Sequence, residues 1–140
     1  MKTFWLALAM LVAGCAPFPR DAAGTTERIE RAGVMQVGVV AGTADWSDAR
    51  RIAERLAADH GATTSTQSGP ASLLLRDLDE GRVDLVVGEF GRSGPVSREA
   101  SLSQAVGQPE PRDGKLPVLR LARKKGENGL ITASDKMVMQ

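Results

Sequence analysis

The sequence predicts an α/β domain of three layers (α/β/α), in which helices cover both faces of a parallel sheet. Three stretches predict its strands: residues 34–40, 62–67 and 83–87. The first and the third are nearly continuous apolar runs rich in β-branched residues, which is typical of strands covered on both faces. A helical pattern separates each strand from the next, giving the order βαβαβ. With right-handed crossovers, the simplest sheet has the strand order 2-1-3.

A short helix over residues 27–32 is expected before the first strand. Thr25 or Thr26 is a suitable side-chain cap for it, acidic residues occupy its first turn, and Gly33 follows its end. Its apolar face is narrow, so we expect this helix to pack at the edge of the domain.

Residues 47–60 have the most regular helical pattern in the chain. Apolar residues recur there at helical spacing, arginines and acidic residues occupy the other side, and Gly61 ends the helix. The strand that follows, residues 62–67, is rich in threonine and less apolar than the other two. It therefore suits a position at the edge of the sheet.

The third helix is predicted by Leu74, Leu75 and Leu78, which recur at helical spacing. Pro70 suits the first turn of this helix, and Gly81 suits the left-handed residue that ends it. The third strand follows directly.

The rest of the chain is less regular. A long connection, residues 89–115, leads to an apolar run over 116–123, which we expect to add an antiparallel fourth strand. The basic residues Arg123 to Lys125 are expected to form the solvated end of that strand. Residues 126–140 are expected to be a C-terminal tail, so the predicted domain spans residues 25–125.

The first 14 residues have the pattern of a signal peptide. Lys2 supplies its positive charge, and the apolar segment that follows is too short to span a bilayer. The sequence Val12-Ala13-Gly14-Cys15 resembles the lipobox of bacterial lipoproteins, which implies that Cys15 is acylated and anchors the chain to a lipid bilayer. Two alternatives remain: a secretory signal with an unrelated cysteine, or a buried structural thiol.

A lipoprotein would lie on the periplasmic face of the cell envelope. Cys15 is the only cysteine of the chain, so no intramolecular disulfide competes for it. Ala16, rather than an aspartate, follows the cysteine, and by resemblance to bacterial lipoproteins this favours the outer over the inner membrane. Residues 15–24 contain two prolines and are expected to form a tether.

Composition argues against several functions. A chain of 140 residues suits one domain, and its net charge of +1 predicts no nucleic-acid partner. His60 is the sole histidine, so no zinc cluster and no cofactor are expected. No serine lies in a Gly-x-Ser-x-Gly motif, and we do not expect an enzyme. Asp84 and Glu89 are candidate paired carboxylates, but Asp84 more simply contacts a neighbouring helix or a backbone amide.

A ligand is expected at the carboxyl ends of the first and third strands, where the strand order reverses. In the loops that follow these strands, Trp46 is a candidate apolar wall, and Arg92 or Arg98 is a candidate bidentate partner for a carboxylate. The alternative is that Trp46 seals the edge of the sheet and that both arginines are solvated.

Several segments resemble, in order, the bacterial extracellular solute-binding proteins of family 3, the amino-acid type. Residues 26–39 resemble the entry helix and first strand, and Val83-Asp84-Leu85 resembles the start of the third strand. Ser97-Arg98 is similar to a Thr-x-x-Arg motif whose arginine side helps hold the α-carboxylate of the ligand. The resemblance covers residues 25–109, and it implies that Ser97 and Arg98 bind ligand.

The departures from this family concern the site and the second lobe. The loop after the first strand is short and lacks the Pro-Phe aromatic wall, for which only Trp46 can substitute. Residues 106–110 stand where the family has Phe-Ser-x-Pro-Tyr. Residues 125–129 already resemble a sequence near the end of full-length members, so the chain is expected to hold a single lobe.

The resemblance implies a lipid-anchored lobe that weakly binds a small amino-acid-like or carboxylate solute and assists a membrane transporter. Pairing with a second copy, as a homodimer, would be a further partnership. The alternative is a degenerate lobe that acts as a protein-interaction or structural lipoprotein without a ligand.

Overall fold

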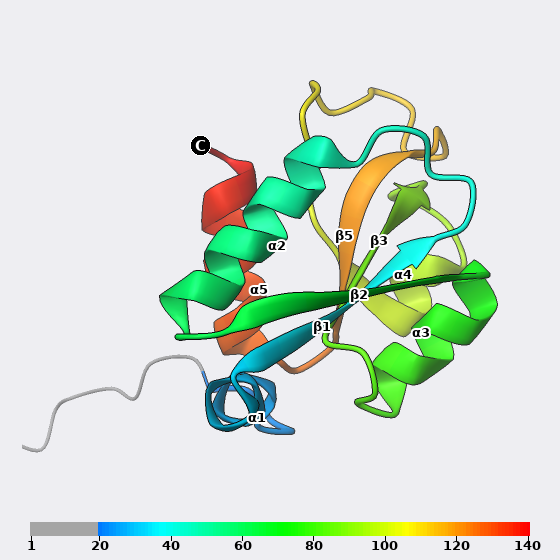
Figure 1. Ribbon diagram of the computed structural model, residues 1–140. Coiled ribbons are helices and arrows are strands. Elements are labelled where there is room, and N and C mark those ends of the chain that lie inside the picture. Colours follow the sequence, from blue (N-terminus) through cyan, green and yellow to red (C-terminus); the bar gives the residue numbers. More distant parts are fainter. Residues whose placement is uncertain (1–19) are drawn as a thin grey trace, which may run out of the picture.

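The computed structural model describes residues 20–140, which fold into a mixed five-stranded sheet with helices on both faces (Figure 1). The predicted signal peptide and Cys15 lie outside the described residues. In chain order, the elements of this part are α1 (Thr25–Ala32), β1 (Val34–Val40), α2 (Ser47–Asp59), β2 (Thr63–Gly69), α3 (Ala71–Asp79), β3 (Leu85–Phe90), α4 (Val96–Glu99), β4 (Ala100–Leu102), β5 (Val118–Lys124) and α5 (Asn128–Val138).

The strand order is β2-β1-β3-β5-β4. β1 pairs in parallel with both β2 and β3, which confirms the predicted 2-1-3 core. β5 runs antiparallel to β3, as predicted for the fourth strand. The three-residue strand β4 was not predicted. It forms inside the long connection and pairs with β5 at the far edge of the sheet.

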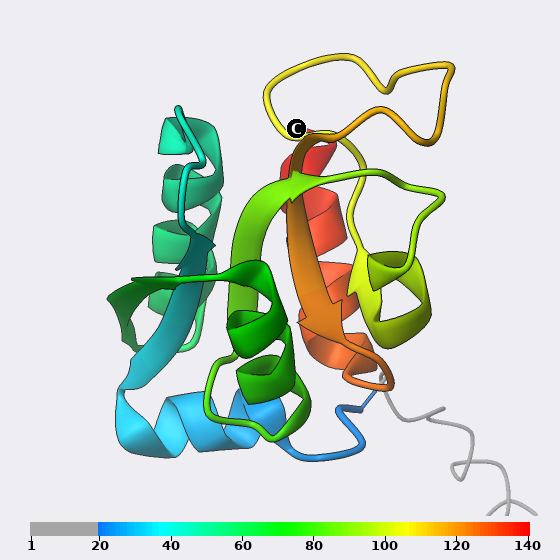
Figure 2. The same cartoon turned by 90° about the vertical axis from the view of Figure 1, so that its right-hand side faces the viewer.

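Two hydrophobic clusters lie on opposite faces of the sheet. On one face, Met35 and Val37 of β1 pack with Leu56 of α2 and Leu130 of α5. On the other face, residues of β3 and β5 pack with Leu74, Leu75 and Leu78 of α3. Figure 2 shows α2 and α3 on either side of the strands. The division follows from the alternation of side chains along each strand.

The prediction of a C-terminal tail over residues 126–140 is wrong. Asn128–Val138 form α5, which packs beside α2 and buries Leu130 completely. The local pattern is weak because Gly129 lies in the first turn and only Leu130 among the apolar residues of the helix is fully buried. Packing against the first hydrophobic cluster stabilises the helix.

The prediction that residues 15–24 form a tether is wrong for residues 21–24. Asp21 is 9% exposed, and its carboxylate accepts hydrogen bonds from the N–H of Thr26 (2.9 Å) and the N–H of Leu130 (3.0 Å). One carboxylate therefore caps α1 and α5 together, and the domain begins no later than Asp21.

Glu127 completes this double cap. Its side chain is fully buried and accepts hydrogen bonds from the N–H groups of Ala23 (2.7 Å) and Thr25 (3.0 Å). The predicted capping of α1 by the Thr25 or Thr26 side chain is therefore wrong. Carboxylates suit these positions because they satisfy free N–H groups and meet the positive end of each helix dipole.

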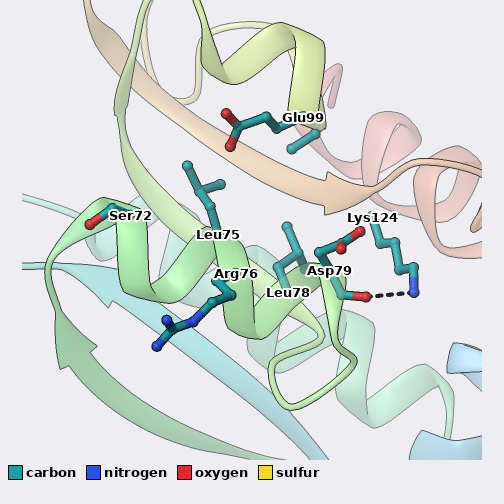
Figure 3. A pocket seen from close by; sticks show the side chains of 8 residues that line it. Ser72, Leu75, Arg76, Leu78, Asp79, Glu99 and Lys124 are labelled. Atoms are coloured by element: carbon teal, nitrogen blue, oxygen red, sulfur yellow. Dashed lines mark hydrogen bonds between the residues drawn. The ribbon is translucent and has the colours of Figure 1, made fainter.

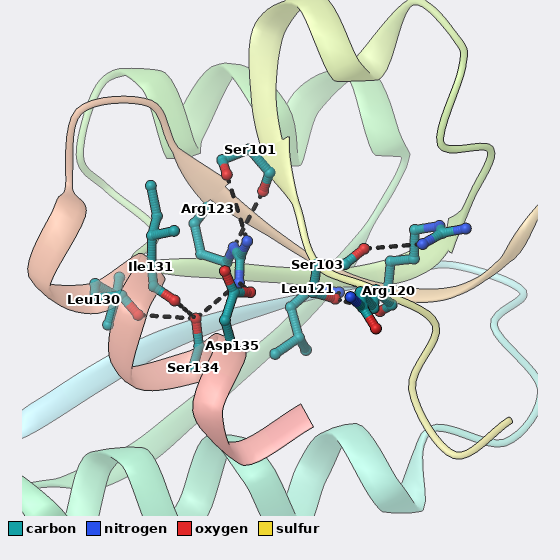
Figure 4. A network of polar contacts seen from close by, with 10 residues as sticks. Ser101, Ser103, Arg120, Leu121, Arg123, Leu130, Ile131, Ser134 and Asp135 are labelled. Carbon is teal, nitrogen blue, oxygen red and sulfur yellow. Dashed lines mark hydrogen bonds and ion pairs between the residues drawn. The ribbon is translucent and has the colours of Figure 1, made fainter. Parts of the chain in front are cut away.

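The prediction that Arg123 is solvated is also wrong, because its side chain is 1% exposed. Figure 4 shows its guanidinium between β4 and α5, where Nη1 donates to Ser134 Oγ (2.8 Å) and to Asp135 Oδ1 (2.6 Å). Nε donates to the carbonyl of Ser101. Pairing with β4 and covering by α5 bury this end of β5. In residues 20–140, every buried polar side-chain atom has a hydrogen-bond partner, so this part holds its own core and satisfies its own polar groups.

Candidate functional site

A hollow of about 300 Å³ lies at the carboxyl ends of β1 and β3. This is the end of the sheet at which the sequence predicts a ligand, because the strand order reverses there. The start of α2 forms one wall, and the 103–117 connection forms another. The residues that line it are Ala44, Asp45, Ser47, Asp48, Glu89, Val106, Gly107, Gln108 and Leu119.

The loop after β1 and the start of α2 each place one carboxylate at this hollow. The N–H of Ser47 donates to Asp45 Oδ1 (3.0 Å) as α2 begins, and this hydrogen bond lowers the pKa of Asp45. Asp48 follows in the first turn of α2 and forms an ion pair with Arg51. Asp45 is therefore ionised at neutral pH.

Gly107 brings the 103–117 connection against the start of α2. Its φ of 71° lies in the left-handed region, and a Cβ at this position would overlap the Asp48 side chain. Only glycine satisfies both conditions, so this residue sets how closely the second wall approaches. The sequence analysis did not single out Gly107. A glycine within a connection gives no sign of which helix it will contact.

The charge of the hollow is negative. Asp45, Asp48 and Glu89 all line it, while no lysine or arginine does. In residues 20–140, neither Asp45 nor Glu89 forms an ion pair. Two carboxylates without a cation attract a positive group and repel a carboxylate. The hollow therefore suits an ammonium or guanidinium group.

Trp46 does not line this hollow. Its side chain is partly buried against the first hydrophobic cluster, and the Arg50 guanidinium carbon lies 5.8 Å from the centre of its ring. This distance is within the range of a cation–π contact. The side chain therefore covers part of the core, and the roles of apolar wall and of seal at the edge of the sheet both stay predictions.

Ser97 and Arg98 line a different hollow, of about 470 Å³, together with residues 93–95. Ser97 Oγ donates to the carbonyl of Gly94 (2.7 Å), and the exposed Arg98 accepts a hydrogen bond at its carbonyl from Lys125 Nζ (2.7 Å). The structure thus does not bring Trp46 and Arg98 into one site. In residues 20–140, the Arg98 guanidinium forms no ion pair.

Arg92 is exposed, and its positive charge contributes to a lowered pKa at Glu110. The main cause of that lowering is a hydrogen bond from Arg120, which is completely buried. Arg120 Nη1 donates to Glu110 Oε2 (2.9 Å) and to the carbonyl of Ser103 (2.9 Å), and Nε donates to the carbonyl of Phe90 (3.0 Å). These contacts hold the 103–117 connection against the sheet, and Figure 4 shows Arg120 beside Ser103.

The sequence analysis missed Arg120, although a signal was present. An arginine between Leu119 and Leu121 interrupts an apolar run, and a charge at such a place in a strand calls for a buried partner. The sequence does not show that Glu110, ten residues earlier, is that partner.

Asp84 has the simpler of its two predicted roles. Its carboxylate accepts a hydrogen bond from the N–H of Gln36 (2.8 Å) and forms an ion pair with Arg28 of α1. Burial raises the pKa of Asp84, while both contacts favour its ionised form. This side chain joins β1 and α1 and is not among the residues that line the hollow.

Another hollow, of about 320 Å³, lies between α3, α4 and the end of β5 (Figure 3). Leu75 and Leu78 are its apolar part, and Lys124 Nζ donates to the carbonyl of Asp79 (2.7 Å). None of its lining residues comes from the loops after β1 and β3, so it is not at the switch point of the sheet. In the part described, no helix is long and apolar enough to cross a bilayer, and no cluster of metal-ligating side chains is present.

Solved structures with a similar fold are isolated lobes of a binding protein. The arginine-bound form of domain 1 from TmArgBP matches with a TM-score of 0.62 and 14% identity, covering 80% of this chain and 96% of that one. A single-substitution mutant of the same arginine-bound domain matches with a TM-score of 0.68 and 14% identity, covering 81% and 95%. This domain has the fold of a solute-binding protein lobe. Scanned against protein-family models and curated proteins, the sequence gives no match.

Proposed function

We propose that this lobe binds a small amino-acid-like solute, with the cationic group of the solute in the hollow at the carboxyl ends of β1 and β3. The observation that carries the proposal is the pair of carboxylates there, Asp45 and Glu89, which form no ion pair in residues 20–140, although the nearby charge of Arg51 contributes to the lowered pKa of Asp45. A fold shared with a domain crystallised with arginine supports it. An ammonium or guanidinium group is attracted by both carboxylates, and a second, anionic group of the solute would extend away from them.

Affinity is expected to be modest. The hollow holds about 300 Å³ and is partly open to solvent. Tight small-molecule sites bury most of the surface of the ligand, and a single lobe covers only one side of it. Weak binding suits a protein that hands its solute to a transporter rather than storing it.

The solute is best tested on a soluble form, residues 16–140, by thermal unfolding with arginine, lysine, glutamate and a small dicarboxylate. We expect the basic amino acids to stabilise the domain, and a solute at 100 times its Kd adds about 2.7 kcal/mol. Glu89→Gln and Asp45→Asn should each reduce this stabilisation. Glu27→Gln, on the exposed surface of α1, serves as the matched control and should leave it unchanged.

Two results would contradict this proposal. One is the absence of any shift at millimolar concentrations of all four solutes. The other is stabilisation by glutamate or the dicarboxylate alone, because the hollow repels such solutes. If that second shift were lost in Arg98→Ala, the binding site would lie at Ser97 and Arg98 instead.

The same proposal includes an anchor on the periplasmic face of the cell envelope, where the lobe would serve a membrane transporter. Its support is the sequence Val12-Ala13-Gly14-Cys15, and acylation of Cys15 would hold the lobe at the bilayer. In a bacterial host, we expect the full chain in the membrane fraction and the Cys15→Ser variant released from it. Equal amounts of both in the membrane fraction would argue against a lipid anchor.

A second candidate function is a protein-interaction lipoprotein without a solute. The observation that favours it is the separation of Trp46 from Arg98, because the residues that the family resemblance implies for ligand binding do not meet in one hollow. Failure of the solute panel, together with membrane retention that depends on Cys15, would support this alternative.

A further inference from the structure

Among residues 20–140, no other strand pairs with the outer edge of β2. β2 pairs with β1 along its whole length, from Val34↔Thr63 to Val40↔Gly69, and lies at the end of the sheet. Its sequence, Thr-Thr-Ser-Thr-Gln-Ser-Gly, has no charge and no proline, and no residue of it is buried. Proteins usually protect such edges with charged side chains, prolines, bulges or very short strands. The opposite edge follows this rule, since β4 has only three residues.

Two hydrogen bonds show which backbone groups of β2 point outward. The N–H of Thr63 donates to the carbonyl of Gly33, and the N–H of Ala41 donates to the carbonyl of Gly69. At both ends of the strand, the backbone groups that bond to β1 therefore belong to odd-numbered residues, Thr63 and Gly69. Because the direction of the backbone groups alternates along a strand, the N–H and C=O groups of Thr64, Thr66 and Ser68 point away from the sheet.

We propose that β2 pairs antiparallel with β2 of a second copy of this chain, with Thr66 on the two-fold axis. In this register Thr66 faces Thr66 of the second copy, and Thr64 faces Ser68. Residues that face each other in this way exchange both hydrogen bonds, so every outward N–H and C=O of the three residues is satisfied in both copies. An isologous contact requires this self-complementarity.

The side chains along this edge favour a copy of the same strand. A charged residue close to a two-fold axis meets its own charge, and like charges opposite one another are destabilising. β2 has none, and its threonines and serines form favourable neutral pairs. Leu73 of α3, which is 39% exposed, lies beside Gly69 at the end of the strand and adds apolar surface next to the edge.

This pairing goes beyond the proposed function and does not depend on it. The two sheets would join into one continuous sheet with α2 of both copies on the same face. Because the paired strands run in opposite directions, the two hollows at the carboxyl ends of β1 and β3 face opposite ends of the dimer. Each stays open, so solute binding and dimer formation can be measured separately.

The first test is sedimentation of residues 16–140 over a hundredfold range of concentration. This form lacks Cys15, the only cysteine, so a disulfide cannot produce a dimer. We expect twice the monomer mass at the highest concentration and the monomer mass on dilution. A monomer throughout the range would overturn the proposal.

Amide hydrogen exchange supplies a readout for each residue. In the dimer, the amides of Thr64, Thr66 and Ser68 should be protected, and they should lose this protection on dilution. The amides of Ser65 and Gln67, which point toward β1, should stay protected at every concentration. Protection that is independent of concentration, or that appears at other residues, would overturn the assigned register.

A matched pair of variants completes the test. Thr66→Lys places two positive charges at the axis and should raise the dissociation constant of the dimer at least about tenfold. Gln104→Lys adds the same charge at an exposed site beyond β4 and should leave it unchanged. Circular dichroism shows whether both variants fold. A dimer that withstands Thr66→Lys in a folded protein would overturn the proposal.

Discussion

Replacing Arg120 with methionine is expected to lower the free energy of unfolding by about 2 to 4 kcal/mol. The guanidinium is completely buried and donates to Glu110 and to the carbonyls of Phe90 and Ser103. Methionine fills a similar volume, but it leaves a carboxylate and two carbonyls without their donor. A buried carbonyl that loses its donor costs about 1 to 3 kcal/mol, whereas Glu110 is 24% exposed and keeps a hydrogen bond from the N–H of Ala105, so it adds less.

The acid dependence of this loss follows from Glu110. The hydrogen bond from Arg120 holds the pKa of Glu110 below its ordinary value of 4.5. A carboxyl group with a lowered folded-state pKa stabilises the protein above the ordinary pKa, and this stabilisation is lost as pH falls through the folded-state value. The difference in stability between the wild type and Arg120→Met should therefore be largest at neutral pH and become smaller below about pH 4.5.

Urea unfolding at several pH values measures both effects, with an unchanged m value as the sign of two-state behaviour. Arg82→Met is the matched control. Arg82 is 53% exposed and forms ion pairs with Asp77 and Glu80 at the surface. Arg82→Met should therefore lower the free energy of unfolding far less than Arg120→Met does. If both variants lost the same free energy of unfolding, the burial of Arg120 and its hydrogen bonds would not be what stabilises the protein.

Replacing Glu127 with alanine is expected to cost about 3 kcal/mol of stability. Its fully buried carboxylate accepts hydrogen bonds from the N–H groups of Ala23 and Thr25, and alanine leaves the buried N–H of Thr25 and the partly buried N–H of Ala23 without this acceptor. Hydrogen bonds to a charged group contribute about 1.5 to 3 kcal/mol each. The α1 amides should also exchange faster, since the N-terminus of that helix loses one of its two capping carboxylates and keeps only Asp21.

Glu127→Gln is the control for this variant. Glutamine keeps the size of the side chain and one carbonyl oxygen as an acceptor. The free energy of unfolding of Glu127→Gln should therefore lie between those of the wild type and of Glu127→Ala. The measurement is again urea unfolding. A loss below about 1 kcal/mol in Glu127→Ala would mean that water replaces the carboxylate at these N–H groups.

The local pattern alone determined the central part of the fold. The apolar run over residues 34–40 and the helical spacing over 47–60 predicted β1 and α2 nearly residue by residue. The parallel order of the first three strands followed from chain connectivity and the right-handed crossover. The position of the hollow at one end of the sheet followed in turn, because the strand order fixes where the loops after β1 and β3 meet.

Only the tertiary structure decided which polar residues meet. Asp21 caps a helix that begins more than a hundred residues later, and Arg120 pairs with a glutamate across a connection of irregular conformation. The carboxylates of the hollow come from a loop, a helix and a strand, and Arg98 of the predicted site lies in another hollow. The physical reason is that periodicity records burial along one element, while the partner of a buried charge depends on how the elements pack together.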